Sequence, residues 1–180
     1  MNIFFLDHSP EQSARWMVDK HVVKMILESA QLLSTAHRVL DGRMVAGKSK
    51  TGRNVKRFVL DDSREPVIYT ATHVNHPSAV WARQSVQNYN WLYEHFFELG
   101  CEYTYRYGKT HKCFQGDLSY MRATRPHNLR EYDMTLMPSA MDPQYIISSD
   151  PIINYRNYYK FGKKNLHAYT KRDLPSWLLE

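Results

Sequence analysis

The chain has 180 residues, a formal net charge of +6 and a sequence pI of about 9.3. This length suits a single globular domain that buries a core without disulfides or metals. No apolar stretch is long enough to span a membrane, and the apolar amino terminus is too short for a secretion signal. The composition therefore excludes an integral membrane protein. Two isolated cysteines, Cys101 and Cys113, fit a reducing compartment, so we expect a cytoplasmic protein.

The positive charge and the aromatic content favour a polyanionic partner. The chain contains nine histidines, thirteen tyrosines and four tryptophans. Basic side chains neutralise phosphates, and aromatic rings stack on unpaired bases. We therefore expect DNA as the partner and a monomeric protein. Cys101, His111 and Cys113 lack the paired spacing of a zinc site, so we expect no metal and no cofactor.

One stretch, from Glu11 to about Leu40, predicts a long central helix. Ser9 fits the N-cap, proline occupies the first helical position, and Gln12 completes a capping-box pattern. No proline or glycine interrupts the helix before Gly42. The predicted domain spans residues 1–180, with 41–62 as a basic, flexible insertion.

This helix is apolar around most of its circumference, which is typical of a buried helix. At 100° per residue its polar side chains fall on one narrow line, the polar stripe. The stripe contains Lys20 at its edge, His21, Lys24, Glu28, Gln31 and Thr35. Either the stripe faces a cleft and forms a site, or it is a solvated strip with a Lys24–Glu28 ion pair.

The segment 41–62 is rich in glycine, lysine and arginine and predicts a loose hairpin or loop. Such a segment contacts phosphates without reading sequence, or it is only a solvated excursion. Residues 42–49 match the phosphate-loop expression G-x-x-x-x-G-K-S. That loop needs a strand before it and a helix after it, and the pattern here predicts neither. We therefore expect no nucleotide-triphosphate site.

A second long helix is predicted from His76-Pro77 to about Leu99, with a further helical piece ending at Gly108. A third is predicted over 152–161, after the cap Asp150-Pro151. The fold class is therefore mainly α: a compact bundle of three principal helices with long functional loops and a possible small hairpin near 43–60.

The order of motifs resembles the pyrimidine-dimer DNA glycosylases of the endonuclease V type. Asp19-Lys20-His21 and then Glu28 match the arrangement D-x-H-x(6)-E on the first helix of that family. The later helix led by His76 and the run Tyr158-Tyr159-Lys160-Phe161-Gly162-Lys163 also look similar. The resemblance covers about half of the chain. It implies a compact three-helix protein that flips a nucleotide, cleaves an N-glycosidic bond and nicks the abasic site.

The chain departs from the family pattern at two positions. The family uses the amine of a small, processed amino-terminal residue, whereas Asn2 here should leave Met1 in place. The family also has a basic residue directly before its glutamate, where this chain has Leu27. Met1, Lys20 and Lys24 therefore remain as candidate amines for an imine-forming step.

The predicted function is cleavage of the N-glycosidic bond of a damaged or modified pyrimidine in DNA, with possible abasic-site lyase activity. Two alternatives stay open: an enzyme acting on a free nucleotide or nucleotide-like cofactor, and a non-catalytic nucleic-acid-binding module. The predicted catalytic residues are Glu28, His21 and Lys24. The predicted DNA contacts are Lys20, Gln31, His76, Arg83, Asn88, Arg106, Lys109, His111, Arg156 and Tyr159.

Overall fold

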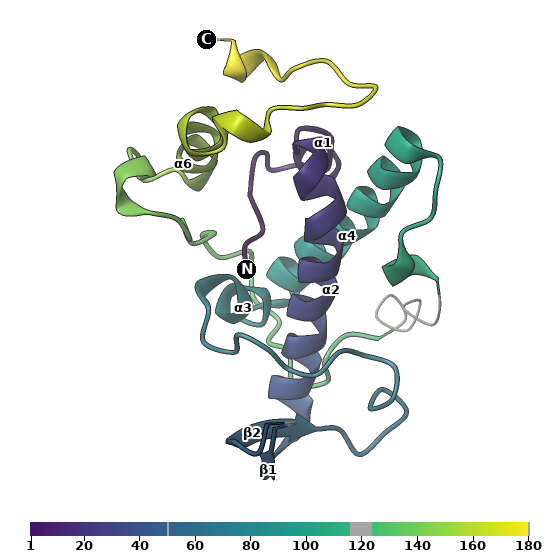
Figure 1. The fold of residues 1–180 in the computed structure, drawn as a ribbon. Coiled ribbons are helices and arrows are strands. Elements are labelled where there is room, and N and C mark those ends of the chain that lie inside the picture. The colour runs from purple at the N-terminus through teal and green to yellow at the C-terminus, as the bar shows by residue number, and fades with distance from the viewer. Residues whose placement is uncertain (50, 116–123, 180) are drawn as a thin grey trace.

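A computed structural model describes residues 1–49, 51–115 and 124–179. The protein is mainly helical, with three principal helices packed together and one two-stranded antiparallel hairpin (Figure 1). The helices and strands are α1 (Pro10–Arg15), α2 (Asp19–Asp41), β1 (Arg43–Lys48), β2 (Asn54–Val59), α3 (Pro77–Ala82), α4 (Val86–Tyr107) and α6 (Pro151–Asn157). Short helical turns are Lys112–Phe114, Pro143–Tyr145, Tyr158–Gly162, Lys164–Leu166 and Ser176–Leu178. The predicted fold class is confirmed.

Helix α2 runs through the middle of the molecule and carries much of the core (Figure 1). Its apolar side chains, among them Val22, Ile26 and Leu33, are fully buried. Helix α2 packs along α4, and α1 also packs against α4. Burial of apolar area drives this packing, at about 25 cal/mol per Å². The prediction of a buried central helix is therefore correct.

The prediction of one unbroken helix from residue 11 to residue 40 is wrong. The chain breaks between Arg15 and Asp19, although Ser9 caps α1 as expected by accepting from the Gln12 amide. The guanidinium of Arg106, from α4, donates to the carbonyls of Arg15 and Met17 at 2.9 Å each. Those carbonyls are therefore satisfied by a distant arginine, which stabilises the break.

The second long helix is also divided, into α3 and α4. Ser85 caps α4 by accepting from the Asn88 amide, and the Asn88 side chain donates to the Trp81 carbonyl at 2.8 Å. The predicted division of the helix after Leu99 is absent, because α4 continues to Gly108; the predicted end at Gly108 is confirmed, and this glycine adopts the left-handed conformation. The Phe114 ring lies against Gly100, where an added Cβ would be 2.5 Å from ring carbons.

The hairpin predicted near residues 43–60 is confirmed. Strands β1 and β2 pair antiparallel, with Arg43 opposite Val59 and Lys48 opposite Asn54. The phosphate-loop expression at 42–49 falls on β1, which leads into the hairpin turn rather than into a helix. Lys50 lies outside the described residues.

The amino-terminal segment packs into the body without forming a strand. Residues Ile3, Phe5 and Leu6 are buried between α2 and the carboxyl-terminal part of the chain. Helix α6 and the π-helical turn after it pack against this segment through Tyr155 and Tyr159. Among the described residues, no helix is long and apolar enough to cross a membrane.

A buried ion cluster joins the start of α2, the end of α4 and the carboxyl-terminal tail. Arg106 contacts Asp19 at 2.8 Å and Glu102 at 2.7 Å, and Arg172 also contacts Glu102 at 2.7 Å. Burial acts to raise the pKa of both carboxyl groups, but hydrogen bonds from Thr170 and Arg106 to Asp19, and from Arg172 and Arg106 to Glu102, outweigh it and hold both pKa values below the ordinary range.

Arg106→Met should lower the free energy of unfolding by about 3–5 kcal/mol, because two buried carboxylates lose a shared cation. The stabilisation that lowered carboxyl pKa values provide is complete above the unfolded-state pKa and is lost as the pH falls through the folded-state pKa. Urea unfolding should therefore show less acid sensitivity below pH 4.5 in the variant than in the wild type. Arg15→Met, which removes an exposed pair with Glu11, is the control. Equal small losses of unfolding free energy in both variants would contradict the role of Arg106 as the shared cation of Asp19 and Glu102.

Candidate active site around Glu28

Glu28 lies halfway along α2 and receives three groups from two parts of the chain. Its Oε2 accepts from the backbone N–H of Asn2 at 2.9 Å and lies 3.9 Å from the α-amine of Met1. Its Oε1 lies 3.1 Å from Nζ of Lys24, one turn earlier on the helix. The Glu28 side chain is 12% exposed and that of Met1 only 3%, whereas Lys24 is 67% exposed. A carboxylate and a primary amine therefore meet at the edge of the core.

Asn2 fixes the amino terminus in this position. Its side-chain Oδ1 accepts from the backbone N–H groups of Ile3 and Phe4, at 2.7 and 3.2 Å. Its Nδ2 donates to the carbonyl of Ala140 at 2.7 Å. Phe4 has a φ of 58°, a left-handed conformation that is costly for an aromatic residue. The local turn therefore holds the first two residues against Glu28.

His21 lies two helical turns before Glu28 on α2. Its ring stacks on Phe4 with centroids 4.2 Å apart, and its Nδ1 is 2.5 Å from the hydroxyl of Tyr159. Burial lowers the pKa of His21 to about 4, with further lowering from the charges of Lys163 and Lys24. His21 is therefore neutral at pH 7 and acts as a support for the amino-terminal turn.

His76 lies beside the cluster from a third element. It caps α3, and its Nδ1 accepts from the Ser78 amide at 3.2 Å, which leaves Nε2 as the protonated nitrogen of the neutral ring. Burial lowers the pKa of His76; the charges of the amino terminus and His73 lower it further, while Glu28 raises it. An imidazole N–H thus accompanies the carboxylate and the amine.

Glu28 lines none of the four cavities that we identify among residues 1–49, 51–115 and 124–179. The roomiest of them, about 470 Å³, lies between the end of α4 and the turn after it and is lined by Phe97, His111 and Phe114. The cleft beside Glu28 therefore remains a prediction, and the Glu28 carboxylate is bonded by its own neighbours Asn2, Met1 and Lys24.

Four of the predicted DNA contacts have structural partners. Asn88 is fully buried and exchanges hydrogen bonds with Thr135, and Arg106 is the centre of the ion cluster described above. Arg83 donates to the Ala79 carbonyl at 2.8 Å. The Arg156 guanidinium lies over the ring of Trp16 at 4.8 Å.

The remaining predicted contacts divide between two regions. Lys20 is exposed and Gln31 half-buried on the polar stripe, while Tyr159 is buried under His21. Lys109 is exposed beyond the end of α4, and His111 accepts from the Cys113 amide there. The structure thus brings His21, Lys24, Glu28, His76 and Tyr159 into one region, with Lys20 and Gln31 on the same helix.

The predicted site residues do not include Asn2, Phe4, Tyr158 and Lys163, although the run from Tyr158 to Lys163 carries part of the family resemblance. The Lys163 Nζ lies 4.6 Å from the Tyr158 ring centroid, and that ring stacks near Phe4 at 6.2 Å. They form an aromatic and basic border next to His21. The one available signal for Asn2 was its residue type, because asparagine side chains accept from following backbone amides.

This arrangement is suited to chemistry at a carbon that develops positive charge. A carboxylate stabilises such a charge or activates a water molecule, and the ammonium of Lys24 or the N–H of His76 can donate to a leaving group. A neutral α-amine can add to an aldehyde carbon and form an imine. The described residues contain no cluster of histidine, cysteine or carboxylate side chains suited to a metal.

Comparison with known proteins yields no match: no family model, no curated protein and no solved structure is similar to the chain. The resemblance to the pyrimidine-dimer glycosylases therefore depends on the motifs in the sequence alone.

His21→Phe should flatten the pH dependence of stability. The folded-state pKa of about 4 lies below the ordinary 6.5, so His21 contributes stability that is complete above pH 6.5 and is lost as the pH falls towards 4. The slope of the unfolding free energy between pH 5 and 6 should fall by about 1 kcal/mol per pH unit, measured by urea unfolding. An unchanged slope would show that His21 is already protonated in the folded protein.

Proposed function

We propose that the protein is a DNA glycosylase that cleaves the N-glycosidic bond of a damaged or modified pyrimidine, with an accompanying abasic-site lyase step. The observation that carries the proposal is the position of the Met1 amine, 3.9 Å from the Glu28 carboxylate. The motif order Asp19, His21 and Glu28 supports it independently. We place the reaction in the cytoplasm, where the free thiols of Cys101 and Cys113 remain reduced.

Glu28 acts first in this proposal. Departure of the base leaves positive charge on the sugar, which the nearby carboxylate stabilises or quenches by activating water. The damaged base must leave the base stack of the duplex to reach Glu28. The tyrosine and lysine side chains next to His21 supply stacking to the base and contact to the phosphates. Lys24 and His76 donate to the departing base.

The Met1 amine is the favoured nucleophile for the lyase step. Of the three candidates, Lys20 has no described contact to Glu28, and Lys24 extends into solvent with 67% of its side chain exposed. The Met1 amine is nearly buried and lies 3.9 Å from Oε2 of Glu28. Its neighbour Glu28 can accept the proton released when the amine adds to the sugar aldehyde.

A non-catalytic nucleic-acid-binding module is the second candidate. It is favoured by the three partners that already contact the Glu28 carboxylate: the Asn2 amide, the Met1 amine and Lys24. In this case the amino terminus and Glu28 form only a structural contact.

Glu28→Gln should reduce base release from a damaged duplex by about 100-fold or more while binding persists, because the variant keeps an acceptor for Asn2 but loses the charge. Single-turnover kinetics with a labelled oligonucleotide measure the first effect and fluorescence anisotropy the second. Glu94→Gln, an exposed glutamate on α4, is the control and should retain full activity. Full activity in Glu28→Gln would overturn the catalytic assignment.

Borohydride should trap a covalent complex with abasic DNA, and peptide mapping should place it on Met1. Acetylation of the α-amine should abolish the complex, whereas Lys24→Gln should retain it. A complex that survives acetylation and disappears in Lys24→Gln would assign the imine to the lysine instead. Base release without any trapped complex would leave a glycosylase that lacks the lyase step.

A further inference from the structure

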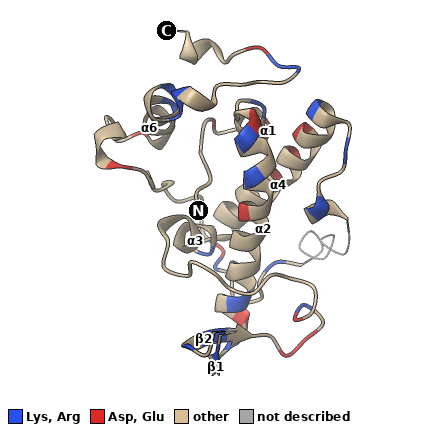
Figure 2. Ribbon diagram, viewed as in Figure 1, with Lys and Arg blue, Asp and Glu red and all other residues tan. Residues whose placement is uncertain are grey.

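The positive charge of the protein is concentrated in one small element. Residues 43–60, which form the hairpin, contain six lysines and arginines and no acidic residue. That number equals the formal net charge of +6, so the rest of the chain is neutral overall. Figure 2 shows this concentration as blue ribbon on β1 and β2, without red on either strand. The hairpin therefore accounts for the whole net positive charge of the protein.

The hairpin projects from the end of α2, away from the carboxyl terminus (Figure 1). Its two strands form a sheet without a third strand, and no residue of either strand is fully buried. Met44 is 58% exposed, and Lys48 and Lys56 are exposed on the same side. Isolated two-stranded hairpins are marginally stable in water, so an uncovered one with this charge is suited to a partner.

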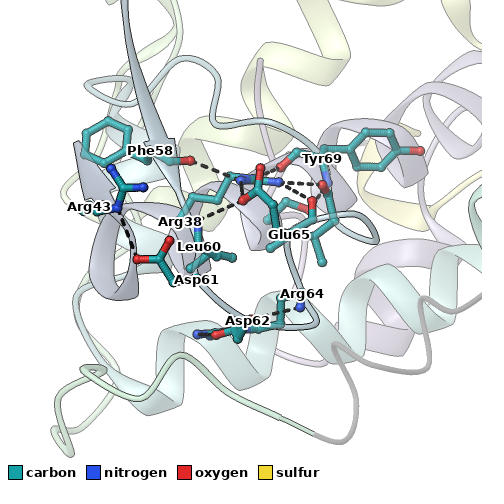
Figure 3. Close-up of polar contacts among 11 residues, drawn as sticks. Arg38, Arg43, Phe58, Leu60, Asp61, Asp62, Arg64, Glu65 and Tyr69 are labelled. Atoms are coloured by element: carbon teal, nitrogen blue, oxygen red, sulfur yellow. Dashed lines mark hydrogen bonds and ion pairs between the residues drawn. The ribbon is translucent and has the colours of Figure 1, made fainter. Parts of the chain in front are cut away.

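A buried arginine attaches the base of the hairpin to α2. Arg38, in the last turn of α2 and 2% exposed, donates to the Phe58 carbonyl on β2 at 3.1 Å. It also donates to the Tyr69 carbonyl and pairs with Glu65, whose carboxylate accepts from the Leu60 amide at 2.8 Å (Figure 3).

A second arginine fixes the segment that follows the hairpin. Arg64 is 3% exposed and pairs with Asp41, the last residue of α2, and with Asp62. These contacts attach the chain on both sides of the hairpin to α2. The strands therefore keep a fixed direction relative to the helix that carries Glu28.

We propose that the hairpin is an arm that enters the major groove of double-stranded DNA. A two-stranded ribbon fits that groove, which is about 12 Å wide, whereas the deep, narrow major groove of duplex RNA excludes it. The free lysines Lys48 and Lys56 and the arginines Arg53 and Arg57 contact the flanking phosphates. This inference concerns the binding of intact duplex and goes beyond the proposed glycosylase function.

The position of the arm sets a geometry for the complex. Asp41 follows Glu28 by thirteen residues of continuous helix, which corresponds to roughly 20 Å. At 3.4 Å per base pair, the hairpin contacts DNA about six base pairs from the nucleotide opposite Glu28. Phosphate contacts by the arm hold the duplex in place and supply no base specificity of their own.

The test uses undamaged duplex DNA and the full chain. Lys48→Gln/Lys56→Gln is compared with Lys112→Gln/Lys164→Gln, which removes the same charge from exposed lysines outside the hairpin and outside the predicted DNA contacts. Fluorescence anisotropy at several salt concentrations should give a roughly tenfold weaker affinity for the hairpin variant, with a salt slope shallower by about 2. The control should keep the wild-type slope. Equal losses of DNA affinity in both variants would contradict the proposal that the hairpin binds DNA.

Groove-specific competitors and duplex RNA complete the test. Methyl green, which occupies the major groove, should displace the wild-type protein, whereas the minor-groove ligand distamycin should not. Duplex RNA of the same sequence should bind more weakly than DNA. Displacement by distamycin alone, or equal binding of RNA, would overturn the major-groove assignment. If the wild-type protein binds duplex DNA through the hairpin but releases no base, the glycosylase proposal is wrong and the proposal for the hairpin stands.

Discussion

The Glu28 carboxylate holds the amino terminus of the chain against the buried helix α2. Without this contact, the Met1 amine would lose its carboxylate partner, and the first two residues would be held only by the contacts of Asn2 with Ile3, Phe4 and Ala140. The contact joins residues that are twenty-six positions apart, and the packing of Phe4 on His21 stabilises it from below. The proposed reaction centre therefore depends on where the first two residues of the chain lie.

Two buried arginines give the rest of the molecule its shape. Arg106 donates to the backbone carbonyls between α1 and α2, and its partner Glu102 binds Arg172 of the carboxyl-terminal tail. Arg38 attaches the hairpin to the other end of α2. Each donates to backbone carbonyls that lack helix or sheet partners, which is what a buried segment of irregular chain requires. The central helix is thereby fixed at both ends, with the proposed chemistry between them and the proposed DNA arm at one end.

Local signals in the sequence predicted the elements that local interactions determine. The caps at Ser9 and Asp150, the stop at Gly108 and the hairpin near 43–60 all depend on residues close in the chain. The break before Asp19 could not be predicted, because an arginine on another helix stabilises it. The mainly helical class followed from periodicity.

The candidate site was predicted only in part for the same reason. Glu28, Lys24 and His21 share a helix face, so spacing alone brought them together, but the contribution of Asn2 depends on tertiary packing.

The most direct test is to incubate the protein with duplexes carrying different damaged or modified pyrimidines and to measure free base by mass spectrometry. The proposal predicts release of a free base from at least one of them, at a rate that falls when the Glu28 carboxylate is removed. Binding to these duplexes without release of any base would contradict it.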